Sequence, residues 1–315
     1  MSKDKENIRI SVVMIDGSFR ENVFGAKYFS EQNFPDEDYE IIWIEYFDRI
    51  HPEISANSKV KAICLDKKGI YHSSYCFNRG IKEARGEIIV IPDADQIVLP
   101  DFLDRVWDLH QAYEKLVVYG YRYDEVQEGI LDSHDFKELE EKCVLKNPFN
   151  FGGCLTVRKK WLVQMNGYEE HDVFRTGFHA NGMLMSSRFK NMGLAIQWEP
   201  SLRLYHPWHP FTLSGSLEYT SQHRVIDWIK SNMLWKTIKG IDSGRNQAPP
   251  AGLKEILDEE LALLDNAIMQ QWKINSISEF PENTTQPLSA REDKVKPLRF
   301  SSNIKNKVLN LLNIK

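Results

Sequence analysis

Runs of apolar residues alternate with amphipathic stretches along the first 120 residues. Ranges 8–15, 39–46 and 88–91 are nearly continuous apolar runs rich in β-branched side chains. This pattern is typical of strands that are covered on both faces. The stretches 21–32 and 73–85 between them have helical spacing. The alternation predicts βαβ units, and hence an α/β protein with a mainly parallel, mixed sheet flanked by helices. Further strands are expected at 59–65 and 115–121.

The second half of the chain is less regular. Range 124–150 is polar and has no clear period, which is typical of either a functional lid or a disordered loop. Apolar and aromatic residues recur at helical spacing over 217–239, which favours packing over a cofactor site. Strands are expected at 151–158, 194–198 and 202–205, and helices at 161–165 and 183–192.

The C-terminal part has a different composition. Range 242–250 is linker-like, 253–272 predicts an amphipathic acidic helix, and 280–297 is rich in Pro, Ser, Thr and charge, which predicts flexibility. The tail 287–315 carries seven basic and two acidic residues, a net charge of +5. Such a tail can rest on an anionic membrane, or it can form a solvated helix packed on its own domain or on a partner subunit.

Composition limits the classes of function. The chain has 315 residues, 42% of them hydrophobic, enough for one large domain or two modest ones. Its net charge of −5 gives no reason to expect a nucleic-acid partner. The four cysteines have no metal-site spacing, which favours free thiols in a reducing compartment. No signal peptide and no apolar run long enough to span a bilayer is visible, so a cytoplasmic location is expected.

Two carboxylates follow the central apolar run. Pro92 cannot donate to a sheet ladder, so the strand is expected to end there, and Asp93 and Asp95 come next. Residues i and i+2 of an extended segment point the same way. Paired carboxylates at the carboxyl end of a strand suit Mn²⁺ or Mg²⁺. The alternative is a plain acidic turn.

The order of several motifs resembles that of the family 2 glycosyltransferases. The resemblance covers roughly residues 8–210 and rests on 11–15, 40–45, 78–87, Asp93-Ala94-Asp95, 152–158, 166–170, 177–182 and His206-Pro207-Trp208-His209-Pro210. It implies the GT-A fold and inverting transfer from a nucleotide-sugar donor. It also implies a domain over 1–241, with a nucleotide-sugar-binding half at 1–120 and an acceptor half at 121–241. A C-terminal helical extension follows at 242–315.

The resemblance also implies roles for individual residues. It implies that Asp95 and His206 bind a Mn²⁺ or Mg²⁺ cofactor, with His209 as the alternative ligand. A packed core histidine is the other interpretation of His206. Five residues are expected to bind the donor: Asp16, Glu45, Asn78, Arg79 and Asp93.

Three positions depart from the family pattern. The Pro that usually follows the first strand is absent at Ile15-Asp16. Glu45 replaces a common Asp. Phe77 stands where an Arg often precedes Asn78, and Arg79 can substitute for it. Arg79 and Arg158 can pair with phosphate or form surface ion pairs.

The largest departure concerns the general base. Asn181 and Gly182 replace an acidic pair that supplies the base in many relatives. Asp172 and His179 are the preferred candidates in its place, beside Glu169 and Glu170, and the assignment stays open.

Three functions remain in competition. The first is a metal-dependent glycosyltransferase that moves a sugar from a UDP-sugar to a glycan or lipid-linked acceptor with inversion. The second is a binding module of the same fold that has lost turnover. The third is a nucleotidyltransferase, ranked last because 16–20 is a poor Gly-rich phosphate loop. If the basic tail meets lipid, the protein is expected at the inner face of the membrane.

Overall fold

The computed structural model describes residues 8–18, 20, 22–131, 133–175, 178–209 and 222–280, except for the side chains of 178, 179, 271 and 272. The strands are β1 Ile10–Asp16, β2 Tyr39–Glu45, β3 Val60–Cys64, β4 Ile88–Pro92, β5 Ile97–Val98, β6 Leu116–Asp124, β7 Val144–Leu145, β8 Cys154–Arg158 and β9 Ala195–His206. The α-helices are α1 Gly25–Ser30, α2 Pro52–Ala56, α3 Ser73–Glu83, α4 Phe102–Ala112, α5 Phe136–Lys142, α6 Lys159–Met165, α7 Phe178–Asn191, α8 Gln222–Ser231 and α9 Ala251–Trp272. Short 3₁₀ turns are η1 Asp36–Asp38, η2 Asp172–Phe174, η3 Ser243–Arg245 and η4 Ile277–Glu279.

The strands at the centre of the sheet are buried on both faces. Every residue of β1 and of β4 is buried. In β4, Ile88 and Val90 enter one apolar layer, whereas Ile89 and Ile91 enter the other. Because successive side chains of a strand point to opposite faces, a continuous β-branched run satisfies both layers. The expectation for these strands is confirmed.

The sheet is parallel in its N-terminal half and mixed beyond it. Its order is β3-β2-β1-β4-β8-β6-β9-β5, with β7 paired to β6. Strands β1 to β4 pair in parallel, β8 runs antiparallel to both β4 and β6, and β6 is parallel to β9. The predicted mixed α/β sheet flanked by helices is therefore confirmed.

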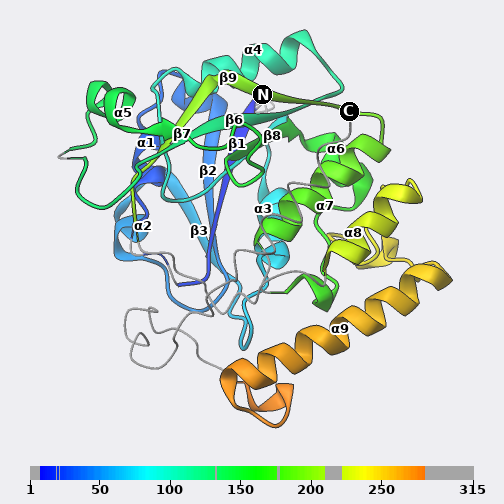
Figure 1. The fold of residues 1–315 in the computed structure, drawn as a ribbon. Coiled ribbons are helices and arrows are strands. Elements are labelled where there is room, and N and C mark those ends of the chain that lie inside the picture. The colour runs from blue at the N-terminus through cyan, green and yellow to red at the C-terminus, as the bar shows by residue number, and fades with distance from the viewer. Residues whose placement is uncertain are drawn as a thin grey trace, which may run out of the picture.

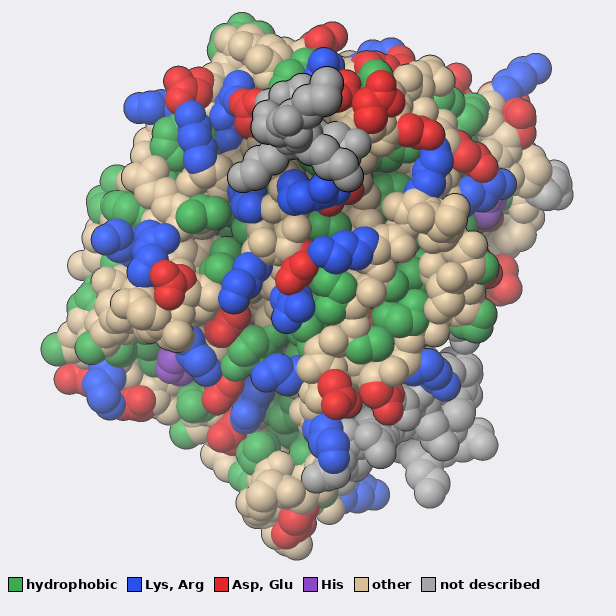
Figure 2. Space-filling view, turned by 180° about the vertical axis from the view of Figure 1, so that it is seen from behind, with side chains coloured by type: hydrophobic (Ala, Val, Ile, Leu, Met, Phe, Trp, Pro, Cys, Tyr) green, Lys and Arg blue, Asp and Glu red, His purple; other side chains and the backbone are tan. Residues whose placement is uncertain are grey.

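Helices cover both faces of this sheet (Figure 1). Helices α1 and α4 pack on one face, and α3, α6 and α7 pack on the other. Helices α8 and α9 form a further cluster with α7 and η2. The C-terminal helix thus packs on the rest of the molecule. Figure 2, the opposite face, shows acidic side chains among the basic ones.

Glycines allow two helices to approach the sheet closely. A Cβ at Gly80 of α3 would lie 2.2 Å from Val13 Cγ1. A Cβ at Gly25 of α1 would lie 2.5 Å from the carbonyl oxygen of Ala94, which accepts a hydrogen bond from Gly25 N at 2.9 Å. Helix α1 is thereby held against the loop that carries Asp93 and Asp95.

Three segments differ from the sequence-based expectation. The polar range 124–150 contains α5 and β7, and Leu139 of α5 is buried against β5 and β9. The two strands expected at 194–198 and 202–205 are one strand, β9, whose pairing with β6 shifts register after Gly120. Helix α8 ends at Ser231, short of the expected 239.

The C-terminal extension is described as far as residue 280. Helix α9 agrees with the helix expected at 253–272. No helix of the described residues is long and apolar enough to span a bilayer. The flexible segment and basic tail expected beyond 280 lie outside the described residues.

Candidate metal and donor site

Polar residues gather at one edge of the sheet, where several strands end. Strands β1, β2 and β4 are parallel, and β8 is antiparallel to both β4 and β6, so β6 and its parallel partner β9 end at the same edge. Ligands of open α/β sheets bind outside the carboxyl ends of the strands. The residues that end or follow these strands are Asp16, Glu45, Asp93, Asp95, Asp124 and His206.

Asp95, His206 and His209 form a cluster with the ligand atoms of a metal site. One side-chain atom from each lies within 4.8 Å of the others. Nε2 of His206 lies 3.7 Å from Asp95 Oδ1 and 3.2 Å from Nε2 of His209. Within the described part of the chain, buried Asp95 Oδ1 has no hydrogen-bond partner. A buried carboxylate oxygen without a donor is costly, and a divalent cation would satisfy it. The residues present therefore fit Mn²⁺.

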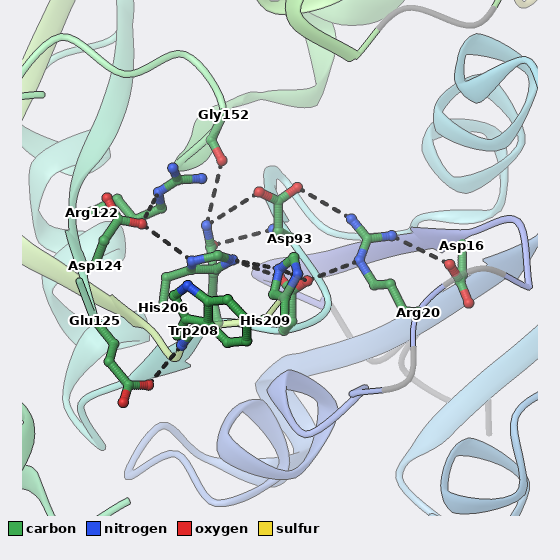
Figure 3. Close-up of polar contacts among 12 residues, drawn as sticks. Asp16, Arg20, Asp93, Arg122, Asp124, Glu125, Gly152, His206, Trp208 and His209 are labelled. Carbon is green, nitrogen blue, oxygen red and sulfur yellow. Dashed lines mark hydrogen bonds and ion pairs between the residues drawn. The ribbon is translucent and has the colours of Figure 1, made fainter. Parts of the chain in front are cut away.

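A second carboxylate fixes the orientation of His206. Asp124 Oδ1 lies 3.2 Å from His206 Nδ1, and the two residues are direct partners in the β6–β9 pairing. When Nδ1–H donates to Asp124, Nε2 is left as a lone pair that faces Asp95. Next to it, Glu125 Oε2 accepts a hydrogen bond from Trp208 N at 2.7 Å, which holds the chain between the two histidines (Figure 3).

Arg20 lies between three carboxylates, one at the end of β1 and two in the loop after β4 (Figure 3). Its guanidinium is 3.3 Å from Asp95 Oδ2, 3.4 Å from Asp16 Oδ1 and 3.6 Å from Asp93 Oδ1. It also donates to the carbonyl of Ile15 at 3.1 Å. Burial alone would raise the pKa of Asp95, but the charge of Arg20 opposes this and holds the pKa below its ordinary value. The sequence pattern alone does not place Arg20 in the site.

Asp93 is held by a buried amide. Gln96 Oε1 accepts from Asp93 N at 3.2 Å, while Gln96 Nε2 lies 3.4 Å from both Asp93 Oδ2 and the carbonyl of Gly152. The loop before β8 is thereby tied to the acidic loop. The structure thus brings Asp93 and Asp95 together around Arg20, as the i, i+2 spacing predicts.

Glu45 closes the site at the end of β2. Its Oε1 accepts from Ser18 Oγ at 3.1 Å and from Phe47 N at 3.0 Å. Burial and the neighbouring Asp16 raise its pKa to about 7. Burial also raises the pKa of Asp16, against the opposing charge of Arg20. Both residues lie where a donor site is expected.

Two predicted donor residues make other contacts in the described structure. Asn78 donates to the Tyr168 carbonyl at 2.9 Å and to Glu170 Oε1 at 2.8 Å, and its Oδ1 accepts from Tyr168 N at 2.7 Å. It therefore joins α3 to the loop after α6. Arg79 forms a surface ion pair with Glu83 at 3.0 Å.

Phe77 and Arg158 also have structural contacts. Phe77, at the position where an Arg is common, stacks on Tyr168 with ring centroids 4.4 Å apart. Arg158 pairs with Glu87 and donates to the carbonyl of His110.

The candidate bases differ in their surroundings. Asp172 is exposed in η2, where its charge acts on the pKa values of Tyr46, His72 and Lys239. The Tyr46 ring packs edge-on against Tyr71, 5.2 Å away. Tyr71 in turn lies within electrostatic reach of Arg20. Asp172 therefore acts on Tyr46, whose ring contacts Tyr71. His179 lies in the first turn of α7, and its side chain is outside the described residues.

The carboxylate of Glu169 accepts hydrogen bonds that stabilise the fold. Its Oε2 accepts from Arg188 at 2.7 Å and from Ile238 N at 2.9 Å, and its Oε1 accepts from Lys239 N at 2.9 Å. Both side chains of the Glu169–Arg188 pair are fully buried. Burial raises the pKa of Glu170, which accepts from Asn78.

Asn181 and Gly182, at the position of the usual acidic pair, carry no charge and are packed closely against neighbouring residues. Asn181 is buried, and its amide donates to Ser73 Oγ at 2.8 Å. A Cβ at Gly182 would lie 2.7 Å from Phe151 Cβ. A carboxylate at 182 would therefore meet the loop that precedes β8. Burial lowers the pKa of His72, which precedes Ser73, to about 4, so this histidine is neutral at neutral pH.

The fold is shared with known sugar transferases. Residues 1–349 of S. aureus TarS in complex with UDP superpose with a TM-score of 0.53 at 13% identity, over 81% of this chain and 71% of that one. The complex of the same protein with UDP-GlcNAc gives 0.52 at 13%, over 81% and 72%. GalNAc-T7 with UDP, GalNAc and Mn²⁺ gives 0.54 at 13%, over 89% and 59%. No curated protein matches the sequence.

The fold defines the class of protein first. It is the GT-A fold of glycosyltransferases. Residues 61–165, a third of the chain, match the model of glycosyl transferase family 2. The resemblance expected from the sequence is confirmed.

Proposed function

We propose that the protein is a metal-dependent glycosyltransferase that takes a UDP-sugar donor and transfers the sugar with inversion to a glycan or lipid-linked acceptor. The observation that carries the proposal is the convergence of Asp95 Oδ1, His206 Nε2 and His209 Nε2 beside the carboxylates of Asp16 and Asp93. The UDP complexes of TarS and the UDP and Mn²⁺ complex of GalNAc-T7 support the choice of nucleotide and metal.

The residues of the sheet edge bind and orient the donor. Asp95, His206 and His209 hold the cation, which supplies Lewis-acid stabilisation of the leaving diphosphate when bound. Asp124 orients the His206 ring so that Nε2 points at Asp95. Asp93 faces the donor sugar or ribose, and Glu45 with Asp16 faces the nucleoside. Asn78 and Arg79 are assigned to the surrounding framework because of their present contacts.

Asp172 is our preferred general base. Inversion requires a group that takes the proton of the acceptor hydroxyl as it attacks the anomeric carbon. Asp172 is an exposed carboxylate whose charge acts on Tyr46, and the Tyr46 ring contacts Tyr71. Glu169 is excluded from this role by its three hydrogen bonds within the fold. His179 stays the second candidate.

A binding module without turnover is the second candidate function. It is favoured by one observation, the neutral and filled position of Asn181 and Gly182. Under this alternative the metal and nucleotide still bind, but no sugar is transferred. The two functions therefore differ in turnover and agree in binding.

The domain and location assignments stay predictions. We assign 1–120 to the donor half, 121–241 to the acceptor half and 242–315 to the extension. A cytoplasmic location, with the basic tail at the inner face of an anionic membrane, is consistent with a lipid-linked acceptor.

The test is release of UDP from a panel of UDP-sugars, with and without Mn²⁺. We expect Mn²⁺-dependent release in the wild type, none in Asp95→Ala, and full release in Asp108→Ala, an exposed carboxylate on α4 that serves as the matched control. Mn²⁺-dependent UDP binding without release from any donor would favour the binding module. Release that is equal without metal and in Asp95→Ala would contradict the proposal.

A further inference from the structure

Arg20 occupies the centre of the candidate site. Its side chain is 10% exposed, and it contacts carboxylates that follow β1 and β4. Its Nε lies 3.3 Å from Asp95 Oδ2, while NH1 is shared between Asp16 and the carbonyl of Ile15. One guanidinium therefore balances three acidic side chains of the sheet edge.

A divalent cation would compete with this guanidinium. Asp95 is at once a partner of Arg20 through Oδ2 and a metal-ligand candidate beside His206 and His209. Two cations on one carboxylate repel each other strongly in a partly buried site. A bound divalent ion is the largest local charge in such a site. Metal binding is therefore expected to weaken the Arg20–Asp95 contact.

A guanidinium displaced from Asp95 in this partly buried site would be stabilised by another anion. Arg stays charged at any working pH, and its planar donors match the oxygens of phosphate. The contacts to Asp16 and Ile15 lie at the end of β1 and do not involve the metal-ligand candidates, so they can keep the side chain at the sheet edge. The anion that arrives with the metal under the proposed function is the donor diphosphate.

We propose that Arg20 exchanges partners. In the metal-free protein it neutralises Asp95. When Asp95 coordinates the metal, Arg20 binds the donor diphosphate instead. This inference rests on the proposed function. It makes Arg20 a competitor of the metal and a partner of the nucleotide. Removal of its charge should therefore change the two affinities in opposite directions.

The experiment is calorimetric titration of Arg20→Gln with Mn²⁺ alone, and then with UDP at saturating Mn²⁺. Compared with the wild type, we expect Mn²⁺ affinity without nucleotide to rise about tenfold, because a competing cation is gone. We expect UDP affinity at saturating Mn²⁺ to fall about tenfold or more, because a charge-assisted phosphate contact is lost. The matched control is Arg105→Gln on α4, whose exposed partner is Asp101. Both of its affinities should stay unchanged.

Other outcomes would overturn the exchange. A fall of both affinities in Arg20→Gln would indicate a structural role only, and an unchanged UDP affinity would exclude the diphosphate contact. If that variant does not fold, Arg20→Lys, which keeps the charge, should bind Mn²⁺ like the wild type and UDP more weakly. A structure of the wild type with Mn²⁺ and UDP that retains the Arg20–Asp95 contact would also contradict the proposal. Absence of Mn²⁺-dependent UDP binding in the wild type would instead contradict the proposed function itself.

Discussion

The proposed donor side and the proposed acceptor side of the sheet edge differ in their charged groups. On the donor side, Asp16, Asp93, Asp95 and Arg20 form one ion-pair network that continues into His206. On the acceptor side, where relatives place an acidic pair, the space between α3 and α7 holds an amide, a hydroxyl and a neutral buried histidine. Carboxylates are thus concentrated where metal and nucleotide are expected, whereas positions 181 and 182 carry none.

This difference assigns metal and nucleotide binding to one set of residues and proton transfer to another. A charged, hydrogen-bonded donor side can hold a cation and a diphosphate with the residues present. Under the proposed function, the acceptor side requires a base from outside the usual position, and Asp172 is an exposed carboxylate whose charge acts on His72. Donor binding and turnover should therefore respond to different substitutions.

Replacement of Asp172 by Asn is expected to have the largest effect. Loss of a general base lowers the rate by about 10²- to 10⁴-fold. UDP affinity at saturating Mn²⁺ should stay within about twofold, since no donor-site residue is changed. UDP release from the active donor and calorimetry measure the two quantities. An unchanged rate would remove Asp172 as the base and direct attention to His179.

Glu169→Gln should destabilise the fold without a selective effect on turnover. The substitution leaves Arg188 buried without its charge partner, which costs about 3–5 kcal/mol of unfolding free energy. Denaturant unfolding measures this loss, with exposed Glu259→Gln as the control. If Glu169→Gln kept full stability and lost turnover alone, Glu169 would be the base after all.

Buried His72 on the proposed acceptor side predicts a pH dependence of the unfolding free energy. Burial lowers the pKa of His72 to about 4, below its unfolded value near 6.5. Between these values the unfolded state binds more protons, so stability falls as the pH drops from 6.5 towards 4, by about 3 kcal/mol in total. Denaturant unfolding at several pH values should show this slope, and His72→Gln should remove that part of it. A slope that is identical in the variant would mean that His72 titrates normally.

The smallest of these effects is expected for Asp124→Asn. Loss of the carboxylate that orients His206 should weaken Mn²⁺ affinity about 10- to 100-fold, as is typical for partners of metal-bound histidines. Calorimetry with Mn²⁺ alone measures it. Unchanged affinity would indicate that His209 is the histidine ligand and that His206 is a packing residue.

The sequence indicated the donor side well where strand patterns set the geometry. The apolar run 88–91 ends at Pro92, and this placed Asp93 and Asp95 together at the sheet edge, where they share Arg20. The histidine segment follows β9 for the same reason. The register of the paired strands sets the relative positions of the residues at the strand ends. The strand pattern therefore predicts which of these residues lie close together.

Arg20 and Asp124 could not be placed from the sequence. Arg20 lies in an irregular segment, where no period indicates the direction of a side chain. Asp124 meets His206 only because β6 extends beyond 121 and its register with β9 shifts after Gly120. Alternation over Arg122, Tyr123 and Asp124 was the available signal for a longer strand. The Phe151 contact at Gly182 depends on a loop and a helix from distant parts of the chain.

Calorimetric titration of UDP with and without Mn²⁺, on the wild type and on Asp95→Ala, tests the central claim most directly. The account predicts that UDP binds the wild type more tightly with Mn²⁺ than without it. It also predicts that this gain disappears in Asp95→Ala, because the variant removes the carboxylate between His206 and His209. UDP binding that does not depend on Mn²⁺, or that depends on it equally in the variant, would contradict the assignment of this sheet edge as the metal and donor site.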